Sequence, residues 1–192
     1  MLKRILLTGS VAIVFLACSL SAHADTITYT AIMTGNAEVP PTGSPATGLT
    51  TLSLTGALLT VNVTYSGLIG GNPSAAHIHC CIPPGDNAPV AIPFTGFPTT
   101  TSGTYTNTFD LSLAATYTAA FITAEGGTVA GAEAAVLAGL NDYQTYSNIH
   151  NTTFPGGEIR GIIIATPEPG TLLLLGTGLA GAAGVLRRRL HA

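Results

Sequence analysis

The residues with the clearest chemical potential are histidines and cysteines gathered in one short segment, His77-Ile78-His79-Cys80-Cys81. If this segment is a β-strand, alternate residues share a face, so His77, His79 and, where the strand continues, Cys81 point the same way. Two such imidazoles can chelate one metal ion, and His150, at the end of another predicted strand, can supply a third nitrogen. Imidazole ligands of this kind suit copper or zinc. The residues favour a structural role, in which the histidines bond loop carbonyls and fix a turn, with the metal site as the alternative.

The two adjacent cysteines, Cys80 and Cys81, offer a second kind of chemistry. Neighbouring Cα atoms are about 3.8 Å apart, which is below the usual range for a disulfide. An oxidising compartment nevertheless disfavours two free thiols. We predict a vicinal disulfide that locks the turn before Ile82, with metal ligation and intermolecular pairing as alternatives. The C-x-x-C spacing of catalytic thiols is not present in the sequence.

A third constellation follows a Pro-Gly turn and consists of Gly157, Glu158 and Arg160. Glycine permits the tight turn that leads into a final strand, on which Glu158 and Arg160 share a face. Arg160 is the only basic residue between positions 25 and 166. We predict that its guanidinium forms an internal ion pair or clamps carbonyl groups, with contact to a ligand as the alternative. Glu38, which lies two residues before Pro40, is expected to cap a neighbouring loop at the surface. No residue set for catalysis is evident.

Strands must position these residues, because apolar and polar residues alternate with a period of two along most of the central region. Val129–Leu140 breaks the alternation, is rich in alanine and predicts one short helical insert. About eight or nine short strands with one such insert predict an all-β protein, an antiparallel β-sandwich. The strand candidates are Thr26–Thr34, Leu49–Leu54, Leu59–Tyr65, Ala75–His79, Val90–Phe94, Thr104–Asp110, Tyr117–Ala124, Thr145–His150 and Glu158–Ala165.

The N-terminal residues 1–24 carry a targeting signal rather than part of the fold. They combine a positively charged start, an apolar stretch and an Ala-His-Ala cleavage site. This order predicts a secretory signal peptide read by the Sec export machinery. Lipidation at Cys18 is the alternative. The exported domain is then expected to span residues 25–166.

The C-terminal residues 167–192 carry a second signal. They begin with Pro167-Glu168-Pro169, continue with an apolar run over 171–186 and reach Arg187-Arg188-Arg189 near the end. The run is shorter than the ~20 residues that a spanning helix usually needs, but its leucines and glycines fit a short membrane helix. The basic end of that helix is expected to stay in the cytoplasm.

Removal of both signals changes the charge balance. The segment 25–166 keeps one of the six basic residues and eight of the nine acidic residues, a formal charge of about −7 against −3 for the whole chain. A surface of this kind is unsuited to phosphate backbones, so nucleic-acid binding is not expected. Docking on anionic lipid is disfavoured for the same reason.

Three patches of the central region together resemble the chordin-type domain, usually written CHRD. They are Gly35-Asn36-Ala37-Glu38-Val39-Pro40-Pro41, Ala76-His77-Ile78-His79 and a closing block from Tyr146 to Gly161, with Asn151 in place of the usual threonine. The resemblance covers about residues 27–164 and implies a β-sandwich, extracellular placement and a binding role. The histidine pattern is also loosely similar to copper/zinc superoxide dismutase, so the sandwich is expected to be immunoglobulin-like or superoxide-dismutase-like. The bridging histidine and zinc loop of that enzyme are not recognisable in the sequence.

The tail resembles the PEP-CTERM sorting signal of Gram-negative bacteria. That resemblance implies recognition of Pro167-Glu168-Pro169 by an exosortase-type protease, with a precursor in the inner membrane and a product at the cell surface, often beside exopolysaccharide production. We therefore expect a non-enzymatic surface or matrix protein without a cofactor, which binds extracellular protein or polysaccharide or contributes to a biofilm. The alternative is an extracytoplasmic copper- or zinc-binding protein that uses His77, His79 and His150.

Overall fold

The alternating segments of the sequence form nine antiparallel strands. The computed structural model describes residues 25–166 and 169–190, so the predicted signal peptide and the sorting residues Pro167 and Glu168 lie outside the described part. The strands run in the order β5-β4-β7-β8-β1-β2-β3-β6, and β9 also pairs with β1. Their bounds are β1 Thr26–Thr34, β2 Thr47–Thr55, β3 Leu58–Ser66, β4 Pro73–Cys80, β5 Val90–Pro93, β6 Gly103–Asp110, β7 Thr145–Asn151, β8 Ile159–Ile162 and β9 Ile164–Ala165.

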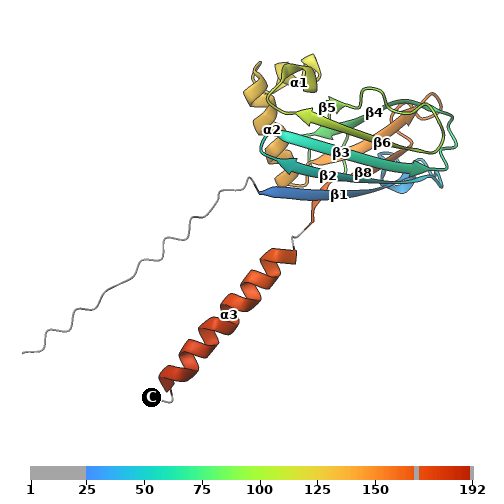
Figure 1. The fold of residues 1–192 in the computed structure, drawn as a ribbon. Helices are drawn as coiled ribbons and strands as arrows, with labels where there is room; N and C mark the ends of the chain where they lie inside the picture. Colours follow the sequence, from blue (N-terminus) through green and yellow to red (C-terminus); the bar gives the residue numbers. More distant parts are fainter. Residues whose placement is uncertain (1–24, 167–168, 191–192) are drawn as a thin grey trace, which may run out of the picture.

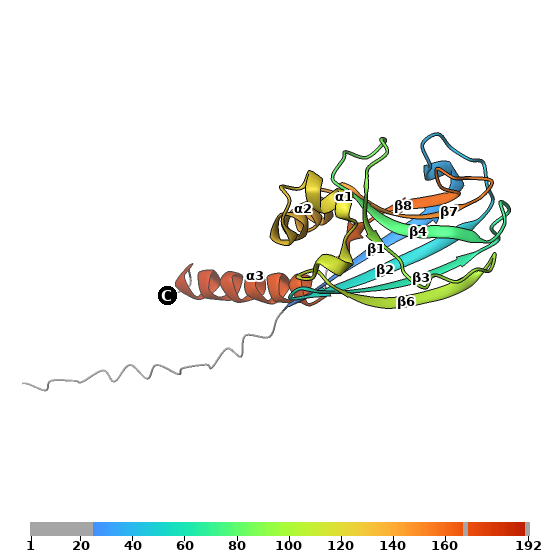
Figure 2. The same ribbon diagram turned by 90° about the horizontal axis from the view of Figure 1, so that it is seen from above.

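The strands make one continuous sheet that curls over on itself, as Figure 1 and Figure 2 show. β1 joins two halves, because it pairs with β2 along its whole length and with β8 and β9 on its other side. We call β1, β2, β3 and β6 the first half-sheet, and β4, β5, β7 and β8 the second half-sheet. Their inner faces meet where the Thr50 hydroxyl of β2 donates to the Ser147 hydroxyl of β7 at 2.9 Å. The prediction of a mostly β, antiparallel fold is confirmed, but a single curled sheet replaces the two separate sheets of a sandwich.

Hydrophobic burial holds the two halves together. Leu59 of the first half-sheet and Ile78 of the second are both 0% exposed, and a fully buried side chain of this size contributes about 1.5–3 kcal/mol. Aromatic rings close the seam between the edge strands β5 and β6. Phe94, which follows β5, stacks on Tyr105 and Phe109 of β6 with ring centroids 5.3 and 6.1 Å apart. The core therefore lies inside the curled sheet, between the inner faces of the two half-sheets. A polar site on the second half-sheet is then expected on its outer face.

Two short helices lie at one end of the sheet (Figure 1), where a single helix was predicted. α2 (Val129–Asn141) confirms the helix expected from the alanine-rich segment. α1 (Ala119–Ala124) occupies most of the segment predicted as a strand, Tyr117–Ala124, so that prediction is wrong. The helix begins where the Thr118 hydroxyl accepts a hydrogen bond from the Phe121 N–H, and it is stabilised because Phe121 is only 1% exposed.

The C-terminal apolar run lies within α3 (Pro169–Leu190). In the described parts of the chain, no helix is both long enough and apolar enough to cross a membrane. The predicted membrane helix over 171–186 is therefore not confirmed.

Candidate metal centre

The three histidines lie on the outer face of the second half-sheet, opposite the hydrophobic core. His77 and His79 belong to β4, and His150 belongs to the neighbouring antiparallel strand β7. Ile78 and Ile149, which alternate with them, are 0% exposed in the core. Strand alternation therefore turns all three imidazoles to the outer face.

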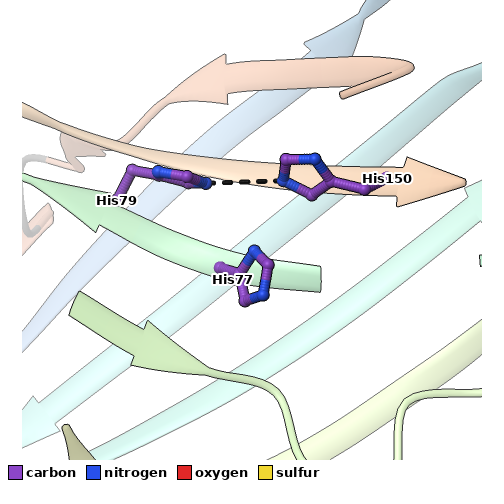
Figure 3. A group of neighbouring side chains, drawn as sticks. All are labelled: His77, His79 and His150. Atoms are coloured by element: carbon purple, nitrogen blue, oxygen red, sulfur yellow. Dashed lines mark hydrogen bonds between the residues drawn. The ribbon is translucent and has the colours of Figure 1, made fainter. Parts of the chain in front are cut away.

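The structure brings the three imidazoles together. One ligand nitrogen from each of His77, His79 and His150 lies within 4.8 Å of the others, and the Nε2 atoms of His79 and His150 are 3.4 Å apart. Figure 3 shows these two rings pointing toward each other, with the His77 ring beside the gap between them. The arrangement on which the predicted metal site depends is therefore present.

Two backbone carbonyls decide which ring nitrogen carries hydrogen. His79 Nδ1 is 2.8 Å from the Ala88 oxygen, and His150 Nδ1 is 3.0 Å from the Pro155 oxygen. A carbonyl can only accept, so each Nδ1 carries the hydrogen and donates it, and in a neutral ring Nε2 then holds an unprotonated lone pair. The structural role considered for these histidines, bonding to loop carbonyls, thus uses Nδ1 and leaves Nε2 for an ion.

Burial keeps the rings neutral. It lowers the pKa of His79 to about 4, and burial together with the nearby His150 lowers the pKa of His77 to about 4. Burial also lowers the pKa of His150, and the charge of Arg160 acts in the same direction. At neutral pH two lone pairs therefore face each other at 3.4 Å, which is repulsive unless a cation lies between them. His77 Nδ1 adds a third nitrogen that is buried and has no hydrogen-bond partner among the described residues.

The distances fit a first-row transition metal. Histidine nitrogens bind zinc at about 2.0–2.1 Å, which places two ligands of a tetrahedral site about 3.3–3.4 Å apart. The His79–His150 separation of 3.4 Å agrees with this value, and a ring nitrogen of His77 lies within 4.8 Å of both. Three neutral imidazoles suit zinc or copper, and a site with three protein ligands keeps its fourth position open.

Tyr146 and Arg160 support His79. The Tyr146 ring stacks on the His79 ring with centroids 4.6 Å apart and planes 6° from parallel, and Arg160 Cζ lies 4.4 Å from the centre of the Tyr146 ring. The Tyr146 hydroxyl accepts a hydrogen bond from the Ala88 N–H at 3.1 Å. Ala88, whose carbonyl orients His79, is therefore held in place by Tyr146. Such supporting contacts are usual around metal-binding histidines.

Arg160 pairs with Glu38 in the interior. Arg160 Nε is 2.6 Å from Glu38 Oε2, and the two side chains are only 3% and 2% exposed. Nη2 donates to Asn87 Oδ1 at 2.5 Å, and Nη1 donates to the Asp86 carbonyl at 3.4 Å. Burial raises the pKa of Glu38, and Arg160 opposes that effect. The ion pair and the carbonyl clamp therefore both exist, but the expectation of a surface cap at Glu38 is wrong, because this carboxylate balances a buried guanidinium.

Glu158 has a separate, structural set of contacts. Its Oε1 accepts from the Ser44 hydroxyl at 2.6 Å and from the Ile69 N–H at 2.7 Å. Its Oε2 accepts from the Gly70 N–H at 3.1 Å and from the Asn151 side-chain amide. Glu158 therefore ties two loops to the start of the closing strand and does not belong to the histidine cluster.

The two cysteines lie apart from the histidines. The structure joins Cys80 and Cys81 by a disulfide, so neither sulfur is available to the three imidazoles as a thiolate. Cys80 is 0% exposed and lies beneath α2, where a Cβ atom added to Gly139 would come within 2.6 Å of its sulfur. Cys81 adopts a positive φ of 80°, which ends the strand.

The described sorting residues belong to α3 and not to the strands that carry the histidines. Pro167 and Glu168 lie outside the described residues, Pro169 is the first residue of α3, and Arg187-Arg188-Arg189 belong to its last turns.

Sequence reasoning missed the residues that surround the histidines, above all Tyr146, Asn148, Asn87 and Ala88. Tyr146 and Asn148 alternate with His150 along β7, so period-two alternation could have placed them on the same face. Asn87 and Ala88 lie in a loop, and nothing in the local sequence ties that loop to Arg160 or His79.

Comparison with protein families agrees with the motifs. A family model described as the CHRD domain matches residues 29–163, and a model described as the PEP-CTERM protein-sorting motif matches residues 165–189. The resemblances to the CHRD domain and to the PEP-CTERM signal are therefore confirmed. No curated protein and no solved structure matched the chain.

Proposed function

Because the chain belongs to the CHRD-domain family and carries a PEP-CTERM sorting motif, we propose that it is a surface protein whose domain binds a copper or zinc ion through His77, His79 and His150. The motif implies export and sorting by an exosortase-type system to the cell envelope or surface of a Gram-negative bacterium. The finer steps, Sec-dependent export and cleavage near Pro167-Glu168-Pro169, are part of the proposal. Intact-mass measurement of the extracellular protein tests them, and a product that retains Arg187-Arg188-Arg189 argues against cleavage.

One observation carries the metal-binding proposal. The Nε2 atoms of His79 and His150 face each other at 3.4 Å, while carbonyl groups occupy the Nδ1 atom of each ring. A buried pair of lone pairs without a shared proton is unfavourable, and a metal ion converts that repulsion into two bonds. Copper is favoured over zinc on affinity, because divalent copper stands at the top of the stability order for nitrogen ligands.

Elemental analysis of the full chain, purified without a histidine tag, tests this proposal. We expect about one copper or zinc ion per chain, and loss of that ion in a His79→Ala/His150→Ala variant. His191→Ala is the matched control, because His191 lies in the tail beyond the CHRD domain. A wild-type protein that stays metal-free after incubation with either ion, and is as stable as before, rejects the metal centre.

The proposed role is binding rather than catalysis. Among the described residues, the Nδ1 atoms of His79 and His150 donate to backbone carbonyls and their Nε2 atoms face each other, so neither ring is bonded to a hydroxyl or thiol nucleophile. This pattern supports a site that holds an ion and does not activate a side-chain nucleophile.

A second candidate function, binding of a neutral extracellular polysaccharide, rests on the outer face of the first half-sheet. Hydroxyl and amide groups there pair across strands: Thr26 with Thr55 at 2.7 Å, Thr60 with Thr108 at 2.9 Å and Thr106 with Asn62 at 2.9 Å. The only charged residue in these four strands is Asp110. Co-sedimentation of the full chain with insoluble exopolysaccharide tests this role, and a Thr60→Lys variant that sediments equally well would argue against it.

A further inference from the structure

A buried asparagine beside the histidines makes no hydrogen bond of good geometry to any described residue. Asn148 is 0% exposed, and neither its Oδ1 nor its Nδ2 has such a bond. Among the described residues Glu38 Oε1 has none either, although Oε2 of the same carboxylate accepts from Arg160, and the neighbouring Asn148 side chain counteracts the rise in the Glu38 pKa. Buried amides and carboxylates in folded proteins are normally bonded, so these orphaned atoms call for a ligand or solvent molecule.

The orphaned atoms gather at one point. A Cβ atom placed on Gly157 would collide with Asn148 Oδ1, Asn148 Nδ2 and Glu38 Oε1 together. Gly157 has a positive φ of 122°, and only the absence of a side chain at this position lets Asn148 and Glu38 pack so closely against the turn. The amide of Asn148 and the free oxygen of Glu38 therefore converge on the same small space.

The strand register places Asn148 on the floor of the histidine cluster. His77 is directly opposite Asn148 on the neighbouring strands, while His79 is opposite Tyr146 on one side of that row and Ala75 is opposite His150 on the other. His79 and His150 thus lie on either side of the row formed by His77 and Asn148, and Figure 3 shows their rings pointing toward each other beside His77. Asn148 therefore lies on the same face of β4 and β7 as the three histidines.

We propose that Asn148, supported by Glu38, holds an exchangeable fourth ligand of the metal ion, a water molecule that a small anion can replace. This inference rests on the proposed metal centre. Three imidazoles leave one coordination position open, and a water molecule there needs a donor or acceptor beside it. The Asn148 amide offers both, and Glu38 Oε1 offers a further acceptor.

The surroundings allow exchange at this position. A cavity of about 200 Å³ is lined by Glu38, Pro155 and Gly157, among others, and Pro155 supplies the carbonyl that orients His150. Arg160 holds Glu38 Oε2 at 2.6 Å, which fixes the carboxylate while Oε1 remains available. Solvent and small anions can therefore reach the Glu38 side of the pair formed by Glu38 and Asn148.

Cobalt(II) with azide as the probe tests the inference in the full chain. Cobalt(II) replaces zinc in such sites and reports its ligands through visible absorption. We expect azide to change the spectrum of the wild-type protein saturably. In Asn148→Ala the azide dissociation constant should rise about 10-fold, the lower end of the range for loss of an outer contact, with little change in cobalt affinity. Asn62→Ala, on the outer face of the first half-sheet, is the matched control and should bind azide as the wild type does.

The outcomes separate the two proposals. Failure of the wild type to bind cobalt rejects the metal centre and this inference with it. Cobalt binding without a response to azide, or equal azide binding in Asn148→Ala, overturns the inference and leaves the metal centre standing. If the alanine variant does not fold, Asn148→Asp serves instead, because it keeps the size of the side chain but replaces the donor with a negative charge. Azide should then bind at least as weakly as in the alanine variant, and wild-type affinity in Asn148→Asp would overturn the inference.

Discussion

Both half-sheets consist of antiparallel strands, but they differ in what covers their outer faces. The first half-sheet presents threonine, serine and asparagine to solvent on its outer face, in rows such as Ser53-Thr60-Thr108 that cross three strands. The outer face of the second half-sheet is covered by loops and holds the histidines, Asn148 and the Glu38–Arg160 pair. A buried polar group is costly when it is unpaired and holds a defined geometry when it is paired. The loops that bury the outer face of the second half-sheet, and not the sheet itself, therefore create the candidate site there.

The largest test of this comparison is removal of the buried cation. Arg160→Met leaves Glu38 as an uncompensated carboxylate and should lower the free energy of unfolding by about 3–5 kcal/mol, measured by urea denaturation. The double variant Glu38→Leu/Arg160→Met should recover most of that loss, because no charge then remains buried. A loss below about 1 kcal/mol in Arg160→Met would mean that the pair is solvated and the loops do not seal this face.

Acid should weaken the second half-sheet selectively. An unfolded histidine has a pKa near 6.5, whereas His77 and His79 have pKa values of about 4 in the fold. Above about pH 6.5 both states are neutral. As the pH falls toward 4, the histidines of the unfolded chain become protonated while the buried rings stay largely neutral, so the metal-free protein should lose stability on the order of 3 kcal/mol for each of the two rings.

Chemical denaturation of wild type and His77→Gln/His79→Gln between pH 7 and pH 4 measures this effect. Subtraction of the two curves removes the contribution of the carboxylates. Identical slopes would show that these histidines are not buried in neutral form.

Two adjacent glycines offer a sharper contrast within one loop. Gly157→Ala meets a positive φ of 122° and a collision with Asn148 and Glu38, and should cost about 2–3 kcal/mol. Gly156→Ala meets no atom within 4 Å and should be close to neutral. Thermal unfolding of the two variants distinguishes them, and equal melting temperatures would contradict the crowding inferred at Gly157.

The smallest effect is expected on the first half-sheet. Thr60 and Thr108 share a hydrogen bond of 2.9 Å on an exposed surface, so Thr60→Val should change stability by less than about 0.5 kcal/mol. Urea denaturation checks this value. A loss comparable to that of Arg160→Met would show that the exposed rows stabilise the sheet as strongly as the buried pair does.

Local pattern accounts for what could be predicted from the sequence. The alternation from Thr26 to Thr34 predicts β1 with its observed bounds, and the same alternation places His77 and His79 on one face. Contacts between residues that are far apart in the sequence cannot be predicted from local periodicity. Arg160 and Glu38 are 122 positions apart, and eight carboxylates compete for one guanidinium. α1 was missed because a capping threonine and the burial of Phe121 outweighed the strand-like composition of its segment.

The buried disulfide also fixes an order of assembly. Cys80 lies beneath α2 with no exposed surface, whereas Cys81 is only partly buried, so an oxidant reaches the pair more easily before that helix has docked. We therefore expect oxidation to precede docking, and disulfides form outside the reducing cytoplasm. We expect the newly made chain to keep α2 undocked until it has crossed the inner membrane. The precursor would then remain incompletely folded during translocation. The domain would complete its folding, with α2 docked, only after export and formation of the disulfide.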